Sequence, residues 1–184
     1  PKDHRELASL TKLRLEDLKH HLEHGDDSIA NVLIRADQET ELRNFIGHEL
    51  RRFSNGRYSV TQEEEMADAK RPDLRVTGNG FDAPVPIELK IADNWSGQQL
   101  FERLENQLCR GYLRDSRSKH GFFALIHRGE KSGWDVPNSE SRCDFNALIQ
   151  CLRNRWIEIS KNFSYVEDIH IVGLDLTARK TLPQ

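Results

Sequence analysis

Two acidic residues and a lysine are close together in the segment RPDLRVTGNGFDAPVPIELK, residues 71–90. Asp73 stands at the edge of one short apolar run, and Glu88 and Lys90 belong to a second, VPIELKIA. Alternate residues of a strand share a face, so Glu88 and Lys90 point away from the apolar residues around them. If the two runs pair as strands, Asp73 comes close to Glu88, and a divalent cation relieves the repulsion between their carboxylates. The segment therefore predicts either a solvated hairpin face or a metal site in which Lys90 orients a water or stabilises a phosphoryl oxygen.

Polar residues also stand where two helices should be apolar. A helix expected over residues 37–54 has Glu49 near the centre of an arc of leucine, isoleucine and phenylalanine. A helix expected over residues 96–116 has Gln107 inside an arc of leucines. A buried carboxylate is costly unless it is paired, protonated or bound to a cation, and a buried glutamine can both donate and accept. Backbone groups could satisfy either residue, but together the two residues favour the metal site over the solvated face.

Hydrophobic periodicity predicts the elements that carry these residues. Helices are expected over residues 3–24, 37–54, 96–116 and 143–161, and strands over 57–62, 73–78, 85–92, 121–127 and 168–176. Residues 132–141 have the composition of a loop. This order of helices and strands predicts an α/β fold without internal repeats.

Composition limits the class of protein. The chain has 184 residues, 36% of them hydrophobic and 31% charged, which suits one domain with its own core. No run approaches the roughly 18 apolar residues of a membrane span. The net charge of −3 argues against a protein that coats nucleic acid by charge alone, although residues 103–131 hold seven Lys/Arg against three acids. The cysteines match neither a disulfide framework nor a CxxC zinc pattern, which favours reduced thiols and a cytoplasmic location: Cys109, Cys143 and Cys151.

The first predicted helix has a weak apolar face. Its leucines form a stripe that is too thin to make a core of its own: Leu7, Leu15, Leu18 and Leu22. We therefore expect residues 1–30 to be a linker from a larger protein or a helix that pairs two copies, and residues 31–184 to be the main domain. His20 and His24 have the i, i+4 spacing of a metal pair but lack a third ligand nearby, which favours a solvated role.

The opening segment resembles the signature of a nuclease superfamily. Pro72-Asp73, followed after fourteen residues by Glu88-Leu89-Lys90, is similar to the motif of the PD-(D/E)XK nucleases, which share the restriction-endonuclease-like fold. The α-β-β-β-α-β order over residues 37–127 is similar to their common core and covers about half of the chain. The resemblance implies a central mixed β-sheet of about four to five strands flanked by helices, extended here by a C-terminal α-β unit.

The resemblance also implies roles for individual residues. Asp73, Glu88 and the backbone carbonyl of Leu89 would bind Mg²⁺ or Mn²⁺, and Lys90 would help to activate the hydrolytic water. Many members add a glutamate from the helix before the sheet, and Glu49 stands in that place.

A second motif is matched only in part. Members that resemble RecB- and λ-exonuclease-type enzymes carry Gln-x-x-x-Tyr on the helix after the lysine. Gln107 stands in the place of the glutamine, whereas Tyr112 follows after four residues instead of three. The resemblance therefore implies a site role for Gln107 and does not imply the exonuclease subtype.

The implied function is a metal-dependent endonuclease domain that hydrolyses phosphodiester bonds, in DNA before RNA, within a larger restriction, defence or repair protein. Basic residues near the second motif would hold the nucleic-acid backbone: Arg103, Arg110, Arg114, Arg117 and Lys119. Double-strand cleavage by this fold implies two active sites and hence a homodimer. The alternatives are a catalytically inactive relative that binds nucleic acid or assembles with other proteins, and an RNase.

Overall fold

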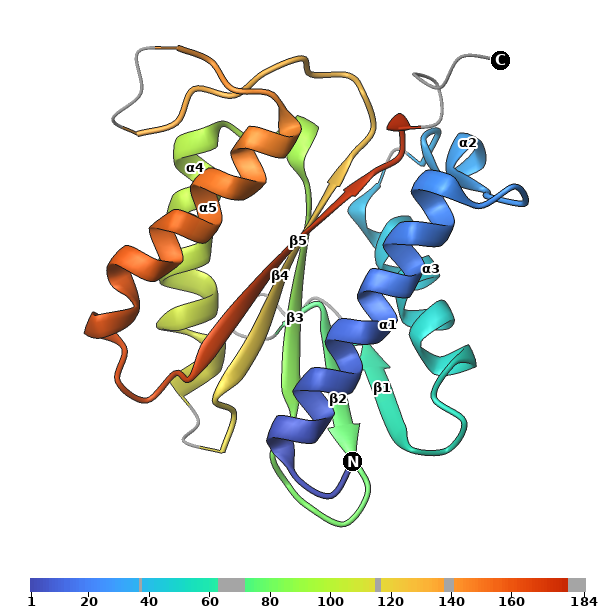
Figure 1. The fold of residues 1–184 in the computed structure, drawn as a ribbon, viewed down its shortest axis with the longest axis vertical. Helices are drawn as coiled ribbons and strands as arrows, with labels where there is room; N and C mark the ends of the chain where they lie inside the picture. The colour runs from blue at the N-terminus through green and yellow to red at the C-terminus, as the bar shows by residue number, and fades with distance from the viewer. Residues whose placement is uncertain (37, 63–71, 115–116, 138–140, 179–184) are drawn as a thin grey trace.

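In a computed structural model, one five-stranded mixed sheet lies between two layers of helices (Figure 1). The structure describes residues 1–36, 38–62, 72–114, 117–137 and 141–178, apart from the side chain of Arg114. The strands follow one another across the sheet in chain order: β1 (Tyr58–Gln62), β2 (Leu74–Gly78), β3 (Val85–Ile91), β4 (His120–His127) and β5 (Asp168–Asp175).

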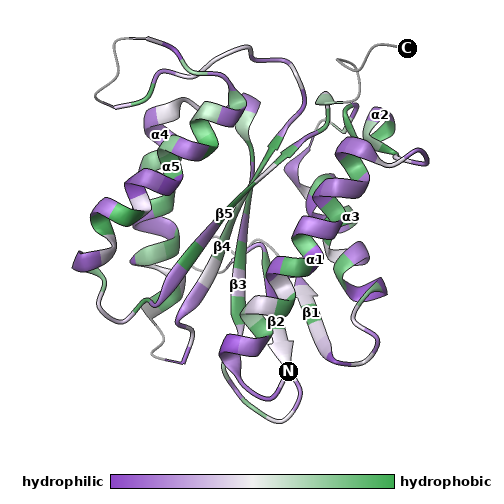
Figure 2. Ribbon diagram, in the orientation of Figure 1, coloured by the Kyte–Doolittle hydropathy of each residue, from purple (hydrophilic) through white to green (hydrophobic). Residues whose placement is uncertain are grey.

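The sheet has an antiparallel half and a parallel half. β1, β2 and β3 form an antiparallel meander, whereas β3, β4 and β5 run parallel because helices connect them. Every residue of β3 and β4 is buried, as expected for parallel strands covered on both faces, whereas buried and more exposed residues alternate in β1 and β2. In Figure 2 the apolar residues run along the central strands, and the helices carry both polar and apolar stripes.

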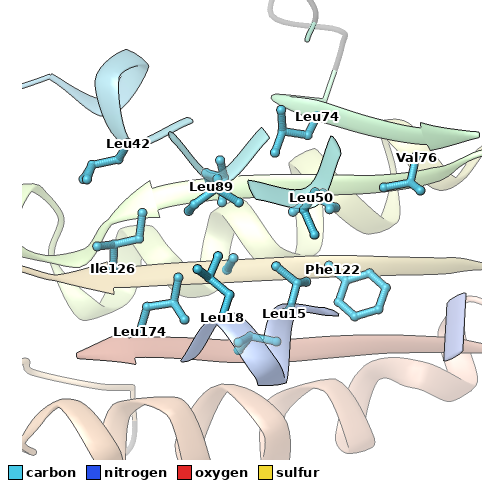
Figure 3. Close-up of a cluster of buried hydrophobic side chains, with 14 of the residues drawn as sticks. Leu15, Leu18, Leu42, Leu50, Leu74, Val76, Leu89, Phe122, Ile126 and Leu174 are labelled. Atoms are coloured by element: carbon cyan, nitrogen blue, oxygen red, sulfur yellow. The ribbon is translucent and has the colours of Figure 1, made fainter. Parts of the chain in front are cut away.

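One face of the sheet is covered by α1 (His4–His24) and α3 (Glu39–Arg52), which the short helix α2 (Ala30–Leu33) connects. Figure 3 shows this core, in which Leu15 of α1 and Leu50 of α3 belong to the same cluster as Leu89 of β3. This packing differs from the separate linker or pairing helix expected over residues 1–30. The thin leucine stripe of α1 is sufficient because it covers one face of a sheet and does not have to form a core alone.

The other face is covered by α4 (Gly97–Glu102), the segments that follow it, and α5 (Phe145–Ile159). α4 begins at a capping box in which Ser96 and Gln99 exchange side-chain and backbone hydrogen bonds. It continues into a π-helix (Arg103–Cys109) and then a 3₁₀ helix (Tyr112–Arg114). 3₁₀ helices of the same length follow β3 (Ala92–Asn94) and α5 (Ser160–Asn162).

The predicted α/β class is confirmed, as is a mixed sheet flanked by helices. The single long helix predicted over residues 96–116 is wrong, because the structure has three consecutive helical forms there. Residues 115–116, and residues 138–140 of the predicted loop, lie outside the described part of the chain. Within the described part, no helix is long and apolar enough to cross a membrane, and all three cysteines are free.

Candidate active site

β3 extends beyond the strand beside it, and two of its N–H groups are left without a strand partner. β2 pairs only with residues 85–87 of β3. Beyond this point, Oδ2 of Asp73 accepts a hydrogen bond from the Leu89 N–H at 2.8 Å, and Oε2 of Glu39 accepts one from the Ile91 N–H at 3.2 Å. Because a buried N–H needs an acceptor, the open edge of β3 holds two carboxylates that come from separate segments.

The ammonium of Lys90 lies among four oxygens. Its Nζ is 2.6 Å from Oε1 of Glu88, 2.7 Å from the carbonyl oxygen of Leu89, 3.0 Å from Oε1 of Glu39 and 3.6 Å from Oδ2 of Asp73. Only 6% of the lysine side chain is exposed. Burial alone would lower the pKa of Lys90, but the charges of Glu88, Asp73 and Glu39 outweigh burial and raise it, so the side chain stays an ammonium.

Asp73 is held from two sides. Nη1 of Arg43 lies 3.3 Å from its Oδ1, while its Oδ2 accepts from the backbone of β3. Arg43 and Glu39 are four residues apart on α3, so both face the same edge of the sheet. The first turns of α3 therefore supply a cation for Asp73 and an anion for Lys90.

Glu88 is the least satisfied acid of this group. Its side chain is 1% exposed, and its 2.6 Å ion pair with Lys90 lacks the geometry of a hydrogen bond. Neither carboxylate oxygen has a hydrogen-bond partner among the described residues. Burial, and secondarily the charge of Asp73, raise the pKa of Glu88 to about 7. The carboxylate oxygens of Glu88 are therefore available to a cation or a proton.

A glutamine and a tyrosine adjoin Glu88 from the helical layer. Nε2 of Gln107 donates to the hydroxyl oxygen of Tyr112 at 2.6 Å, and Nη1 of Arg103 donates to Oε1 of Gln107 at 3.0 Å. Burial and the charge of Glu88 raise the pKa of Tyr112, so its hydroxyl stays protonated. Gln107 lies in the π-helix, and Tyr112 begins the 3₁₀ helix that follows it, so the helix changes form between the two residues. The spacing that departs from the Gln-x-x-x-Tyr motif therefore still places both side chains in contact.

The structure brings some predicted site residues together and leaves one apart. Asp73, Glu88, Lys90 and the Leu89 carbonyl form one cluster, which Gln107 adjoins through Tyr112.

Glu49 is not part of this cluster, because its carboxylate contacts Arg52 at 2.7 Å and His48 at 3.4 Å. It lies about 15 Å along α3 from Glu39, at 1.5 Å per residue. The apolar arc of the helix drew attention to Glu49, whereas Glu39 lies in the polar first turn and has no such signal. Its one sequence signal is an acidic residue at a helix N-terminus, which is common to many helices.

The basic residues predicted to hold nucleic acid have different surroundings. Arg103 contacts Gln107 and lies over the ring of Trp95, with 4.8 Å between the guanidinium carbon and the ring centroid. Three other residues of the set are paired with acids: Arg110 with Glu105, Arg117 with Asp82, and Lys119 with Glu167. The side chain of Arg114 lies outside the described part of the structure. Of the described side chains in this set, Arg103 is therefore the one that contacts the Gln107–Tyr112 pair.

Two cavities differ in their relation to the cluster. A cavity of about 170 Å³ is lined by neighbours of the cluster, Pro72 and Tyr112, together with residues that include Arg75 and Arg117. A larger cavity of about 970 Å³ lies between the α4 layer and α5, and it is lined by acids that include Glu102, Glu105, Asp135 and Glu158. Neither cavity is lined by Asp73, Glu88, Leu89 or Lys90, and the acidic lining of the larger cavity would repel a phosphate, so cavity size does not identify the site.

The oxygens around Lys90 are of the type that Mg²⁺ and Mn²⁺ prefer. Among the described residues, however, no three histidine, cysteine or acidic side chains are arranged to hold a metal ion. No family model, curated protein or solved structure matches the chain. The geometry of the cluster is therefore the basis on which a function can be assigned.

Proposed function

We propose that the chain is a metal-dependent nuclease domain that hydrolyses phosphodiester bonds, with DNA as the favoured substrate. The observation that carries the proposal is the meeting of Asp73, Glu88, the Leu89 carbonyl and Lys90 at the open edge of β3. The proposal is supported by the topology, since an antiparallel meander followed by a helix and a parallel strand resembles the restriction-endonuclease-like core.

The charges of the cluster favour a divalent cation. With every group ionised, three acids (Glu39, Asp73, Glu88) face two bases (Arg43, Lys90), which leaves one negative charge in excess. A phosphodiester would be repelled by this excess, whereas a divalent cation reverses its sign.

The buried oxygens of Glu88 that lack hydrogen bonds fit such an ion. Asp73, Glu88 and the Leu89 carbonyl would hold Mg²⁺ or Mn²⁺. When bound, the ion would supply a more acidic water and would neutralise charge on the phosphate.

The side chains around the cluster would perform separate tasks. Lys90 stays charged and can hold the attacking water or a phosphoryl oxygen. The protonated hydroxyl of Tyr112, held by Gln107, can donate to an oxygen of the substrate. Arg43 fixes the orientation of Asp73.

The open face of β2 offers a contact for the nucleic-acid backbone. Arg75 is paired opposite Pro86, so it lies on the same face of the sheet as Glu88. No acidic partner is found for Arg75 among the residues that the structure describes. Because Arg117 and Lys119 are already paired with acids, Arg75 and Arg103 are the stronger candidates for phosphate contacts.

Lys90→Ala tests the proposal. Cleavage of plasmid DNA with Mg²⁺ or Mn²⁺ should fall about 10²- to 10⁴-fold, the range for a lost acid–base or charge-stabilising group. The matched control is Glu49→Gln, which changes an acid of α3 outside the cluster and should cleave like wild type. Full cleavage by Lys90→Ala, or a wild type that cleaves neither DNA nor RNA, would contradict the proposal.

A second candidate function is a catalytically inactive module that binds nucleic acid. The observation that favours it is the engagement of Lys90 with the oxygens that a cation would use. Calorimetry separates the two functions, since an enzyme should bind Mn²⁺ and lose this binding in Asp73→Ala, whereas a module should retain DNA without binding the ion. RNA offered in the same assay tests the RNase alternative.

A cytoplasmic location and further domains in a larger protein, which the sequence led us to expect, remain predictions. A homodimer would need a contact other than the leucine stripe of α1, because Leu7, Leu15 and Leu22 are buried in the core.

A further inference from the structure

Lys90 has more acceptors around it than it has protons to donate. An ammonium has three N–H donors. Glu88, the Leu89 carbonyl and Glu39 lie between 2.6 and 3.0 Å from its Nζ, whereas Asp73 is at 3.6 Å. Glu39 and the Leu89 carbonyl accept hydrogen bonds from this ammonium, whereas Glu88 and Asp73 contribute charge without a hydrogen bond.

Most of these oxygens are the ones that a divalent cation would need. Asp73, Glu88 and the Leu89 carbonyl would hold the ion in the proposed nuclease. An ammonium and a divalent cation cannot both contact these oxygens, because each needs direct contact and the two positive charges repel at a few Å. Binding of the ion therefore has to move the ammonium.

Glu39 is the acceptor that can keep the ammonium nearby. Its Oε2 is bound to the Ile91 N–H, so the carboxylate is anchored to β3 while its Oε1 contacts Lys90. Its position in the first turn of α3 also favours a negative charge. The side chain is 31% exposed, compared with 1% for Glu88, so a lysine drawn towards Glu39 moves towards the open side of the cluster.

We propose that Lys90 competes with the divalent cation for the oxygens at the edge of β3, and that Glu39 is a positioning residue that retains the displaced ammonium beside the site. The inference rests on the proposed nuclease function. Lys90 then weakens ion binding and, once displaced, remains where a substrate phosphate would lie.

A double-mutant cycle with Mn²⁺ tests this inference by calorimetry. Lys90→Met should bind Mn²⁺ about ten-fold more tightly than wild type, which corresponds to about 1.4 kcal/mol. Glu39→Gln should bind several-fold more weakly, because the displaced ammonium loses its acceptor. In Lys90→Met/Glu39→Gln this weakening should vanish, since no ammonium remains to be retained. Glu49→Gln is the matched control and should leave Mn²⁺ affinity unchanged.

The outcomes separate the two proposals. Equal Mn²⁺ affinity of wild type and Lys90→Met overturns the competition while leaving the nuclease proposal in place. Weakening by Glu39→Gln that persists in the double variant overturns the positioning role, because Glu39 would then be a ligand of the ion. No Mn²⁺ binding by wild type or by Lys90→Met overturns both proposals.

Lys90→Met leaves three acids without their cation, so melting curves are needed to show that it folds. Wild-type protein gives an independent measurement, the rate of reductive methylation of Lys90 followed by mass spectrometry. With saturating Mg²⁺ the rate should rise severalfold, because the side chain moves from a position where it is 6% exposed. An unchanged rate under saturating Mg²⁺ would overturn the inference.

Discussion

Glu88 and Asp93 are two buried carboxylates only five residues apart, and they differ in almost everything but burial. Each side chain is 1% exposed. Asp93 accepts hydrogen bonds from the backbone N–H groups of Arg128 and Glu130, both at 2.8 Å, and of Lys131 at 3.1 Å. The carboxylate oxygens of Glu88 have no hydrogen-bond partner among the described residues.

The pKa values of the two acids follow the donors. Burial alone would raise the pKa of Asp93, but hydrogen bonds from His127 and from the backbone outweigh burial and lower it to about 2. Burial and the neighbouring Asp73 raise the pKa of Glu88 to about 7. The difference teaches that burial alone does not set the pKa of an acid, because the donors and charges around it decide the direction of the shift. Asp93 holds the segment after β4 in place, and Glu88 remains available to a ligand.

The largest expected effect is on stability at Asp93. Asp93→Ala leaves three backbone N–H groups without their acceptor and should lower the free energy of unfolding by about 4 kcal/mol. Denaturant unfolding followed by circular dichroism measures this loss. Asp135→Ala is the control, because that side chain is 86% exposed and its loss should cost under about 0.5 kcal/mol. A loss below about 1 kcal/mol for Asp93→Ala would remove the contrast between the two acids.

The stability that Glu88 contributes should fall as pH rises. Its folded-state pKa of about 7 exceeds the ordinary value of 4.5, so the folded protein binds more protons between these pH values. Its contribution to stability is therefore present below about pH 4.5 and is lost as pH rises through 7, by at most about 3 kcal/mol.

Urea unfolding of wild type and Glu88→Gln from pH 5 to 8 measures this contribution as the difference between the two proteins. Glu49→Gln, which keeps Glu88 intact, should follow wild type. A constant difference between wild type and Glu88→Gln would show that Glu88 titrates normally.

A smaller change should separate the two kinds of donor that lower the pKa of Asp93, the side chain of His127 and the backbone N–H groups. His127→Phe removes a side-chain donor while the ring still packs near Phe145 and Trp134. The pKa of Asp93 should rise from about 2 towards its ordinary 3.8, measured by the carboxyl ¹³C shift. An unchanged pKa would assign the whole effect to the backbone donors.

The smallest expected effect is at the tyrosine beside Glu88. Tyr112→Phe removes the hydrogen bond from Gln107 and should cost about 1 kcal/mol in thermal unfolding. Tyr165→Phe, which removes a hydrogen bond to the Cys109 carbonyl, is a matched control for the loss of a hydroxyl and should cost a similar amount. Cleavage should fall only in Tyr112→Phe, and equal cleavage by both variants would exclude a role for that hydroxyl.

The sequence predicted the strands well, because their signals are local. Alternation in β3 placed Glu88 and Lys90 on one face, and a short connection placed Asp73 beside them. Glu39 could not be predicted, because its contact with Lys90 depends on which end of α3 meets the edge of β3. A helical wheel shows which face of a helix is apolar but gives no information about position along its axis.

The Gln107–Tyr112 contact was hidden for a different reason. The prediction assumed one α-helix over residues 96–116, and this assumption separates the two side chains by a fraction of a turn. In the structure the helix changes from a π-helix to a 3₁₀ helix between these residues, and no residue in the segment predicts that change. The role of α1 in the core was also missed, because a narrow apolar stripe predicts little burial when the helix is considered without the sheet that it covers.

The unequal lengths of β2 and β3 have a consequence for protein engineering. Four more residues of pairing in β2 would extend the ladder along β3 as far as Ile91, and the Leu89 and Ile91 N–H groups would then no longer anchor Asp73 and Glu39. The same relation can be used in reverse. Ending one strand four residues before its neighbour inside a designed sheet leaves backbone N–H donors that can orient acids from elsewhere in the chain. Strand length is then a design variable for building active sites, independent of the residues placed in them.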